Sequence, residues 1–318
     1  MNRIICGVDV SKDWLDAHVA DGQDSGKRAP FKRFGNDASG IARLAAFCRG
    51  HDVELVVMEA SGGYERLAFL LLWEMEMACA LANARSVRYF AEAMGFLEKT
   101  DRIDAGVIAH YAQVKQLQPS PPPSDAQQRL RVLVGRLSQV TGDLTVQRQR
   151  KRTAASAEAA ASIDEVIVLL VRQRRHLEGE IASMIDDDPL WACLDATLRT
   201  FKGIASRTVA VLMAEMPELG LVSNKVIAKL AGLAPIANDS GKRQGRRPVR
   251  GGRAGPRSIL FLIARTVARY DPHMAAFQQR LQEAGKPKMV IRIALARKLL
   301  VILNAKARDA RTEFANAT

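Results

Sequence analysis

The stretch RIICGVDVSKDWLDAHVA, Arg3–Ala20, decides the architecture of the first part of the chain. Residues 3–10 are rich in apolar and β-branched side chains, and residues 16–20 repeat that character after a polar connection. Short runs of this kind, separated by Asp, Gly and Ser, are typical of strands joined by turns. With a third run at 30–34, they predict a meander of three strands.

The sequence then alternates between helical and strand patterns. Helical spacing covers 38–50 and 63–76, and apolar runs at 53–58 and 78–82 indicate strands. A meander followed by β-α-β units is typical of a mixed sheet with helices packed on it. We therefore expect an α/β domain at the start of the chain.

A proline-rich segment, QPSPPPS at 118–124, interrupts these patterns, because four prolines in five positions continue neither a helix nor a strand. Beyond it, apolar residues recur every three or four positions through 125–152 and 162–186. This spacing predicts two long helices in an antiparallel coiled-coil hairpin, packed on its own chain or used for self-association. The rest of the chain is expected to be all-α apart from a loop at 234–257. The predicted domains are 1–117, 118–190 and 191–318.

Charge is distributed unevenly along the 318 residues. The net charge is +13, yet residues 199–318 hold 23 Lys and Arg against 7 Asp and Glu. This asymmetry favours a polyanionic partner such as nucleic acid, although a merely basic soluble surface would have the same composition. The four scattered cysteines indicate neither disulfides nor zinc. Without a long apolar run or signal-like N-terminus, we expect a soluble, cytoplasmic protein.

Four acids are the candidate functional residues of the first domain. Asp9 ends the first predicted strand and Glu59 ends the strand at 53–58, so neighbouring strands would place both carboxylates at one sheet edge. Asp101 and Asp104 are three residues apart at the start of a helix and share a face. Each acid alone also fits a helix cap, a first helical turn or an exposed strand end. Together, without an evident basic partner, they indicate a site for a hard divalent cation.

Three motifs carry a family resemblance: GVDVSKDWLDAHV at 7–19, VVMEASGGYE at 56–65 and KTDRIDAGVIA at 99–109. They resemble the RuvC-like, ribonuclease-H-like domain of the DEDD transposases, the group that contains the Piv-type invertases and the IS one-ten family. The resemblance implies that Asp9, Glu59, Asp101 and Asp104 are catalytic and bind Mg²⁺ or Mn²⁺.

The basic third of the chain contains two candidate DNA-binding features. Residues 198–217 contain apolar helical stretches around Lys202 and Gly203, which predicts a helix-hairpin-helix that holds a phosphate or an ordinary helical hairpin. The loop at 234–257 is long enough to be functional or disordered. Its acid-free basic tract would neutralise phosphates, with affinity that falls as salt rises. The tract comprises Lys242, Arg243, Arg246, Arg247, Arg250, Arg253 and Arg257.

Ser240 lies just before this tract, in an Asn-Asp-Ser-Gly sequence typical of a turn. A serine beside arginines is also a candidate nucleophile for a phosphodiester. The stretch LAGLAPIANDSGKRQGRRPVRGGR, 230–253, resembles the second domain of the same transposases, in which the serine after GLAP is the nucleophile. The resemblance implies that Ser240 forms a phosphoserine-linked DNA intermediate and that a structured bridge RNA guides recombination. Whether Ser240 and the acids of one site belong to the same subunit stays open.

These features together predict a transposase of an insertion sequence, a nucleoid-associated dimer or tetramer that acts on donor and target DNA. One alternative is a metal-dependent junction nuclease in which water attacks and Ser240 is a turn residue. Another is a regulator that binds nucleic acid without catalysis. A third is a sugar-kinase relative, since residues 7–22 are similar to the phosphate loop of actin-like kinases, although the basic loop disfavours it.

Overall fold

The computed structural model describes residues 3–20, 29–60, 62–96, 98, 100–241, 245 and 247–317, without the side chain of Arg102. It contains two compact units, Met1–Pro123 and Ser124–Thr318. The division into three domains at 117/118 and 190/191 stays a prediction. Within the described ranges, no helix is both long and apolar enough to cross a membrane.

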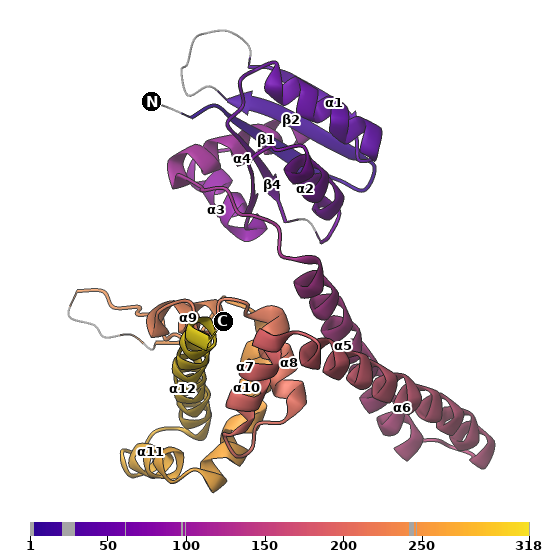
Figure 1. Cartoon of the computed structure of the whole chain (residues 1–318), viewed down its shortest axis with the longest axis vertical. Coiled ribbons are helices and arrows are strands. Elements are labelled where there is room, and N and C mark those ends of the chain that lie inside the picture. Colours follow the sequence, from indigo (N-terminus) through magenta and orange to yellow (C-terminus); the bar gives the residue numbers. More distant parts are fainter. Residues whose placement is uncertain are drawn as a thin grey trace. The chain divides into compact units, whose positions relative to one another are not determined.

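A five-stranded mixed sheet with the order β3-β2-β1-β4-β5 forms the centre of the first unit (Figure 1). The first three strands pair antiparallel, which confirms the predicted meander, and β4 and β5 run parallel to β1. This arrangement is consistent with a ribonuclease-H-like sheet. The strands are β1 (Ile5–Val10), β2 (Trp14–Ala20), β3 (Phe31–Gly35), β4 (Leu55–Glu59) and β5 (Cys79–Ala82).

Two pairs of helices cover the two faces of this sheet (Figure 1). One face packs on α1 and α2 and the other on α3 and α4, and a separate apolar cluster fills each interface. The sequence patterns did not predict α3, which buries only Val87 and Ala91 and so has a narrow apolar stripe. The bounds are α1 (Ala38–Arg49), α2 (Glu65–Glu74), α3 (Ala84–Ala93) and α4 (Asp101–Lys115).

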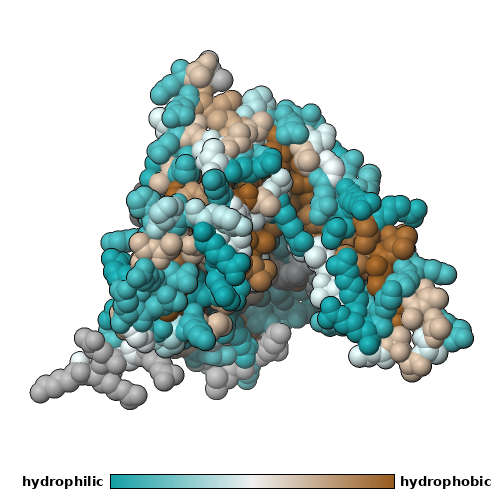
Figure 2. Space-filling model, turned by 90° about the horizontal axis from the view of Figure 1, so that it is seen from below, coloured by the Kyte–Doolittle hydropathy of each residue, from teal (hydrophilic) through white to brown (hydrophobic). Residues whose placement is uncertain are grey.

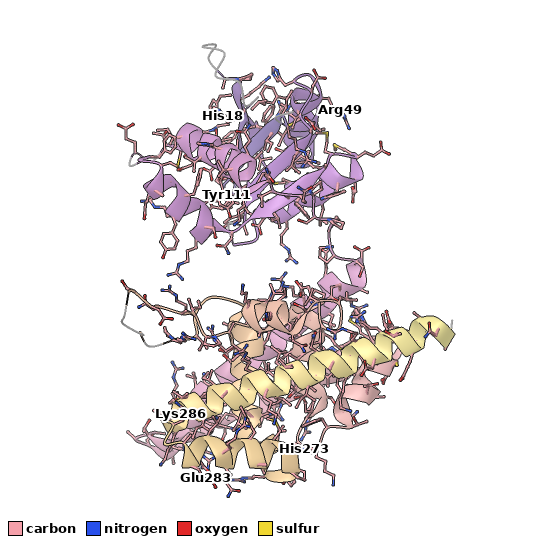
Figure 3. All side chains as sticks on the ribbon, turned by 90° about the vertical axis from the view of Figure 1, so that its left-hand side faces the viewer. His18, Arg49, Tyr111, His273, Glu283 and Lys286 are labelled. Atoms are coloured by element: carbon pink, nitrogen blue, oxygen red, sulfur yellow. The ribbon has the colours of Figure 1, made fainter. Side chains whose placement is uncertain are left out.

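A glycine in β1 lets α4 approach the sheet closely. A Cβ atom at Gly7 would lie 2.1 Å from the carbonyl oxygen of Ala105 and 2.5 Å from the backbone nitrogen of Ala109. Both distances are far below van der Waals contact, so any larger residue would push the helix away. The residue after Ala105, Gly106, faces the ring of His18 on β2, whose atoms lie 3.6 Å from where a Gly106 Cβ would be; Figure 3 labels His18. The turn of α4 that follows Asp104 therefore lies directly against the middle of β1.

Where the structure describes it, the second unit consists of helices and connecting loops, as expected, and α5 and α6 form the predicted antiparallel hairpin. Helix α12 is central, because it packs against α7, α9, α10 and α11. Its buried Asn304 accepts a hydrogen bond from the Gly220 backbone N–H and donates one to the Val222 carbonyl oxygen. The helices are α5 (Asp125–Arg152), α6 (Ala157–Asp186), α7 (Pro189–Arg199), α8 (Ser206–Glu215), α9 (Asn224–Leu230), α10 (Ala254–Tyr270), α11 (Pro272–Glu283) and α12 (Lys288–Ala317).

The close packing at Gly7 predicts a large effect of one methyl group. Replacing Gly7 with Ala should destabilise the first unit by about 1–3 kcal/mol, because the new Cβ overlaps the α4 backbone. Thermal unfolding followed by circular dichroism, with hydrogen exchange in β1 and α4, would measure this loss.

Gly50→Ala is the matched control in the same unit. Gly50 has a right-handed helical conformation, and a Cβ there would meet only ordinary contacts at 3.5 Å or more. Its change in unfolding free energy should stay within about 0.5 kcal/mol. Equal stability of the two variants would show that α4 does not depend on the close approach at Gly7.

Candidate active site

The structure brings the four predicted acids together at one edge of the sheet. Asp9 lies near the end of β1 and Glu59 at the end of the parallel neighbouring strand β4. Asp101 and Asp104 occupy the first turn of α4, which Thr100 caps by accepting a hydrogen bond from the Ile103 N–H. All four acids line one pocket of about 350 Å³. Thr100, rather than Asp101, is the N-cap, so the alternative explanation of Asp101 as a helix cap does not hold.

Mutual repulsion within this pocket changes the chemistry of Asp9. Burial, followed by the negative charges of Asp104, Asp101, Glu59 and Asp16 in that order, raises the pKa of Asp9 from 3.8 to about 6. Desolvation and like charges both disfavour the ionised form of a carboxyl group. A cation in the pocket would reverse both effects. The electrostatics therefore favour binding of positive charge.

An arginine that the sequence analysis did not identify contacts this acidic cluster. Arg33 on β3 donates from Nε and Nη2 to the two carboxylate oxygens of Asp16, at 2.8 and 2.9 Å, and its Nη2 also donates to Asp101. Asp16 is buried and is the cross-strand partner of Asp9. The acids were expected to lack a basic partner, and that expectation is wrong for Asp101. Arg88 of α3 also lines the pocket, but it pairs with Glu92 of its own helix.

The donor set of this pocket fits a hard divalent cation. Carboxylate oxygens are ligands that Mg²⁺ and Mn²⁺ prefer, and Mg²⁺ commonly keeps several waters and contacts only one or two carboxylates. Among the described residues, no three His, Cys, Asp or Glu side chains are arranged to hold a metal ion directly. The carboxylates of Asp9, Glu59, Asp101 and Asp104 are the groups in this pocket that would hold such a cation, directly or through its waters.

Ser240 lies in the second unit, on the long loop between α9 and α10 (Figure 1). The two sides of this loop pair with each other, since the Ile236 N–H donates to the Pro248 carbonyl oxygen at 3.0 Å. At its base, a Cβ on Gly252 would lie 2.2 Å from the Gly232 nitrogen, and both glycines have φ of +64°. Glycine is the residue that tolerates both this conformation and this approach. The loop at 234–257, expected from sequence to lack regular structure, therefore has its two sides paired and close together at its base. We call this loop the arm.

Asp239 organises the outer part of this arm. Its carboxylate accepts a hydrogen bond from the Gly245 N–H at 3.1 Å and forms an ion pair with Arg247 at 2.8 Å. Ser240 follows directly and is exposed. The sequence shows Asp239 beside Ser240 but does not indicate the role that this acid has. Asp239 joins the two sides of the arm next to the candidate nucleophile.

The predicted DNA-contacting residues differ in their surroundings. Lys202 and Gly203 are exposed in the turn between α7 and α8, where Gly203 has φ of +97°. Arg250 is exposed, whereas Arg257 donates to the Gly251 carbonyl oxygen. Arg253 forms two hydrogen bonds of 2.6 Å with Glu218 and one with the Glu215 carbonyl oxygen, which anchors the end of the arm to the helices. Lys242, Arg243 and Arg246 lie outside the described residues.

An acidic pocket on a mixed sheet, joined to a strongly basic helical unit, fits an enzyme that acts on DNA. A family model described as Transposase, of the DEDD IS110 type, matches residues 6–156, and that of the Transposase IS116/IS110/IS902 family matches 195–279. The chain belongs to this transposase family.

Curated relatives extend over nearly the whole chain. The pilin gene-inverting proteins of Moraxella lacunata and Moraxella bovis are each 27% identical over 330 residues, covering 98% of both chains. Among solved structures, Thermus thermophilus RuvC, alone and with a Holliday junction substrate, is 14% identical over 37% of this chain and 99% of its own. The TM-scores are 0.29 and 0.28.

The raised pKa of Asp9 predicts a pH-dependent stability. In the folded protein Asp9 keeps its proton up to about pH 6, whereas the unfolded chain loses it near 3.8, so this stabilisation disappears as pH rises through that window. Asp9→Asn cannot ionise and should be more stable than wild type above pH 6. We expect about 1 kcal/mol after allowance for the partial exposure of Asp9.

Urea unfolding with a metal chelator, measured between pH 4 and pH 7.5, would test this prediction. The advantage of Asp9→Asn should shrink to nothing near pH 4. Asp13→Asn, the same chemical change at an exposed position before β2, is the control. An advantage of Asp9→Asn that does not vary with pH would contradict the electrostatic origin.

Proposed function

We propose that this chain is a site-specific DNA recombinase of an insertion sequence that cuts and rejoins DNA through Ser240, with Asp9, Glu59, Asp101 and Asp104 as ligands of Mg²⁺ or Mn²⁺. The observation that carries the proposal is the gathering of four acids from β1, β4 and α4 in one pocket. When bound, the cation would supply positive charge to stabilise the phosphate during its displacement. Similarity to pilin gene-inverting proteins supports recombination as the outcome.

The proposed chemistry conserves the number of phosphodiester bonds. The Ser240 oxygen attacks phosphorus, the bond between phosphorus and one deoxyribose oxygen breaks, and a phosphoserine link forms. The serine proton passes to solvent, and the departing oxygen takes a proton from solvent. A hydroxyl of the new DNA partner then attacks the phosphoserine and loses its proton to solvent, and the departing Ser240 oxygen takes a proton from solvent. Exposure of Ser240 on the arm leaves its hydroxyl accessible to a phosphate.

The basic second unit would hold the DNA for this reaction. Lys202 and Gly203 lie exposed in a turn between two helices, and we propose that this turn binds a phosphate as a helix-hairpin-helix does. The basic residues of the arm would add further phosphate contacts, including Lys242, Arg243 and Arg246. Such binding should weaken steeply with salt. Because Arg247 and Arg253 already pair with Asp239 and Glu218, Arg250 is the stronger candidate among the described arginines.

A guide RNA and self-association complete the proposal. The bridge RNA rests on the family resemblance alone, and its phosphates would suit the same basic surface. Val166, Val168 and Leu169 of α6 are exposed. Figure 2 shows hydrophobic residues gathered at the right, on the hairpin formed by α5 and α6. Exposed apolar side chains of this kind are typical of protein interfaces. A dimer or tetramer through this hairpin would provide more than one Ser240 for the several strand cuts of recombination.

A covalent-trapping experiment tests the proposed function. The protein is incubated with Mg²⁺, RNA flanking its element and end-labelled donor and target DNA, then denatured. Label should migrate with wild-type protein and be absent from Ser240→Ala, which should still bind DNA because only one hydroxyl is removed. Asp104→Asn should reduce adduct formation by at least about a hundredfold if the carboxylate contributes to charge stabilisation.

A junction nuclease is the second candidate, because all four acids lie in the first unit and water could act in place of Ser240. It predicts free cut ends in both wild type and Ser240→Ala, without label on the protein. A regulator without catalysis predicts intact DNA in every sample that contains RNA and Mg²⁺. Adduct formation in Ser240→Ala at the wild-type level would remove Ser240 from the mechanism.

A further inference from the structure

Arg33 links a buried acid, Asp16, to an acid of the pocket, Asp101. Its guanidinium holds Asp16 through two hydrogen bonds and reaches Asp101 with the same Nη2. The Asp16 side chain is 5% exposed, whereas the side chains of Arg33 and Asp101 are 46% and 60% exposed. The buried pair with Asp16 therefore fixes the guanidinium, and the exposed contact with Asp101 is the more easily broken one.

We propose that Arg33 is a positioning residue that holds the Asp101 carboxylate in the metal-free protein and is displaced from it when a divalent cation binds the pocket. This inference rests on the metal site of the proposed function. Arg33 competes directly with a cation for the lone pair of the Asp101 oxygen that accepts its hydrogen bond. The guanidinium charge beside the pocket also repels a cation.

The geometry makes this exchange easy to reverse. After Asp101 leaves, Arg33 keeps both hydrogen bonds to Asp16, so the buried carboxylate never loses its partner. Trp14 supports the guanidinium, which lies 6.0 Å from its ring centroid. Arg33 thus offsets negative charge among the acids while the cation is absent. Its removal should make the pocket bind a divalent cation more tightly.

Mn²⁺ titration of the full chain, with free Mn²⁺ measured by electron paramagnetic resonance at low ionic strength, tests this inference. Arg33→Gln should bind Mn²⁺ about tenfold more tightly than wild type, since it loses a competing charge in direct contact with a ligand. Arg88→Gln is the matched control: Arg88 lines the same pocket but pairs with Glu92, and its affinity should change less than about twofold. A general loss of structure would weaken binding, so a gain reports the loss of competition.

Two further variants separate the possible failures. Asp104→Asn should weaken Mn²⁺ binding; if it does not, the proposed metal site itself is wrong. If Asp104→Asn weakens binding but Arg33→Gln binds no more tightly than wild type, only the role of Arg33 is overturned. If Arg33→Gln unfolds because buried Asp16 has lost its partner, a double variant that carries both Arg33→Gln and Asp16→Asn is used. Its Mn²⁺ affinity is compared with that of the single variant Asp16→Asn. The double variant should bind more tightly, and equal or weaker binding would overturn the inference.

Discussion

The contact between Gly7 of β1 and the backbone of α4 determines where the acids of this protein lie. Without a Cβ at Gly7, the carbonyl oxygen of Ala105 can approach the strand. Asp104 precedes Ala105, and Asp9 lies two residues beyond Gly7 on the same face of the strand, because side chains alternate along β1. One close approach of backbones therefore brings carboxylates from a strand and a helix into one pocket. Glu59 joins them because β4 runs parallel beside β1.

Placing these acids together creates an electrostatic cost in the metal-free protein, which the fold partly relieves. The raised pKa of Asp9 shows the cost: burial and neighbouring carboxylates favour its protonated form. Arg33 offsets part of the negative charge through Asp16 and Asp101. The arm that carries Ser240 has a similar arrangement, since Asp239 pairs with Arg247. Asp101 in the pocket and Arg247 near Ser240 thus already have partners of opposite charge.

The sequence allowed much of this structure to be predicted, because its strongest signals are local. Strand runs, the proline segment and the apolar spacing of α5 and α6 depend on neighbouring residues and were interpreted correctly. Arg33 was missed because its partner Asp16 lies across a strand pair, and no local pattern reports a cross-strand contact. Gly7 had a signal, since a glycine inside a strand often marks a close approach of backbones. The pairing of the two sides of the arm depends on contacts between residues twelve or more apart, such as Ile236 with Pro248.

The most direct test of the account is to locate Mn²⁺ by anomalous scattering in crystals of the protein soaked with that ion. The packing of β1, β4 and α4 predicts a peak in the pocket formed by Asp9, Glu59, Asp101 and Asp104, with Asp101 released from Arg33. Asp104→Asn crystals treated identically should show a weaker peak or none. A Mn²⁺ peak bound elsewhere, with this pocket empty at saturating concentration, would contradict the claim that the close packing at Gly7 builds a metal-binding active site.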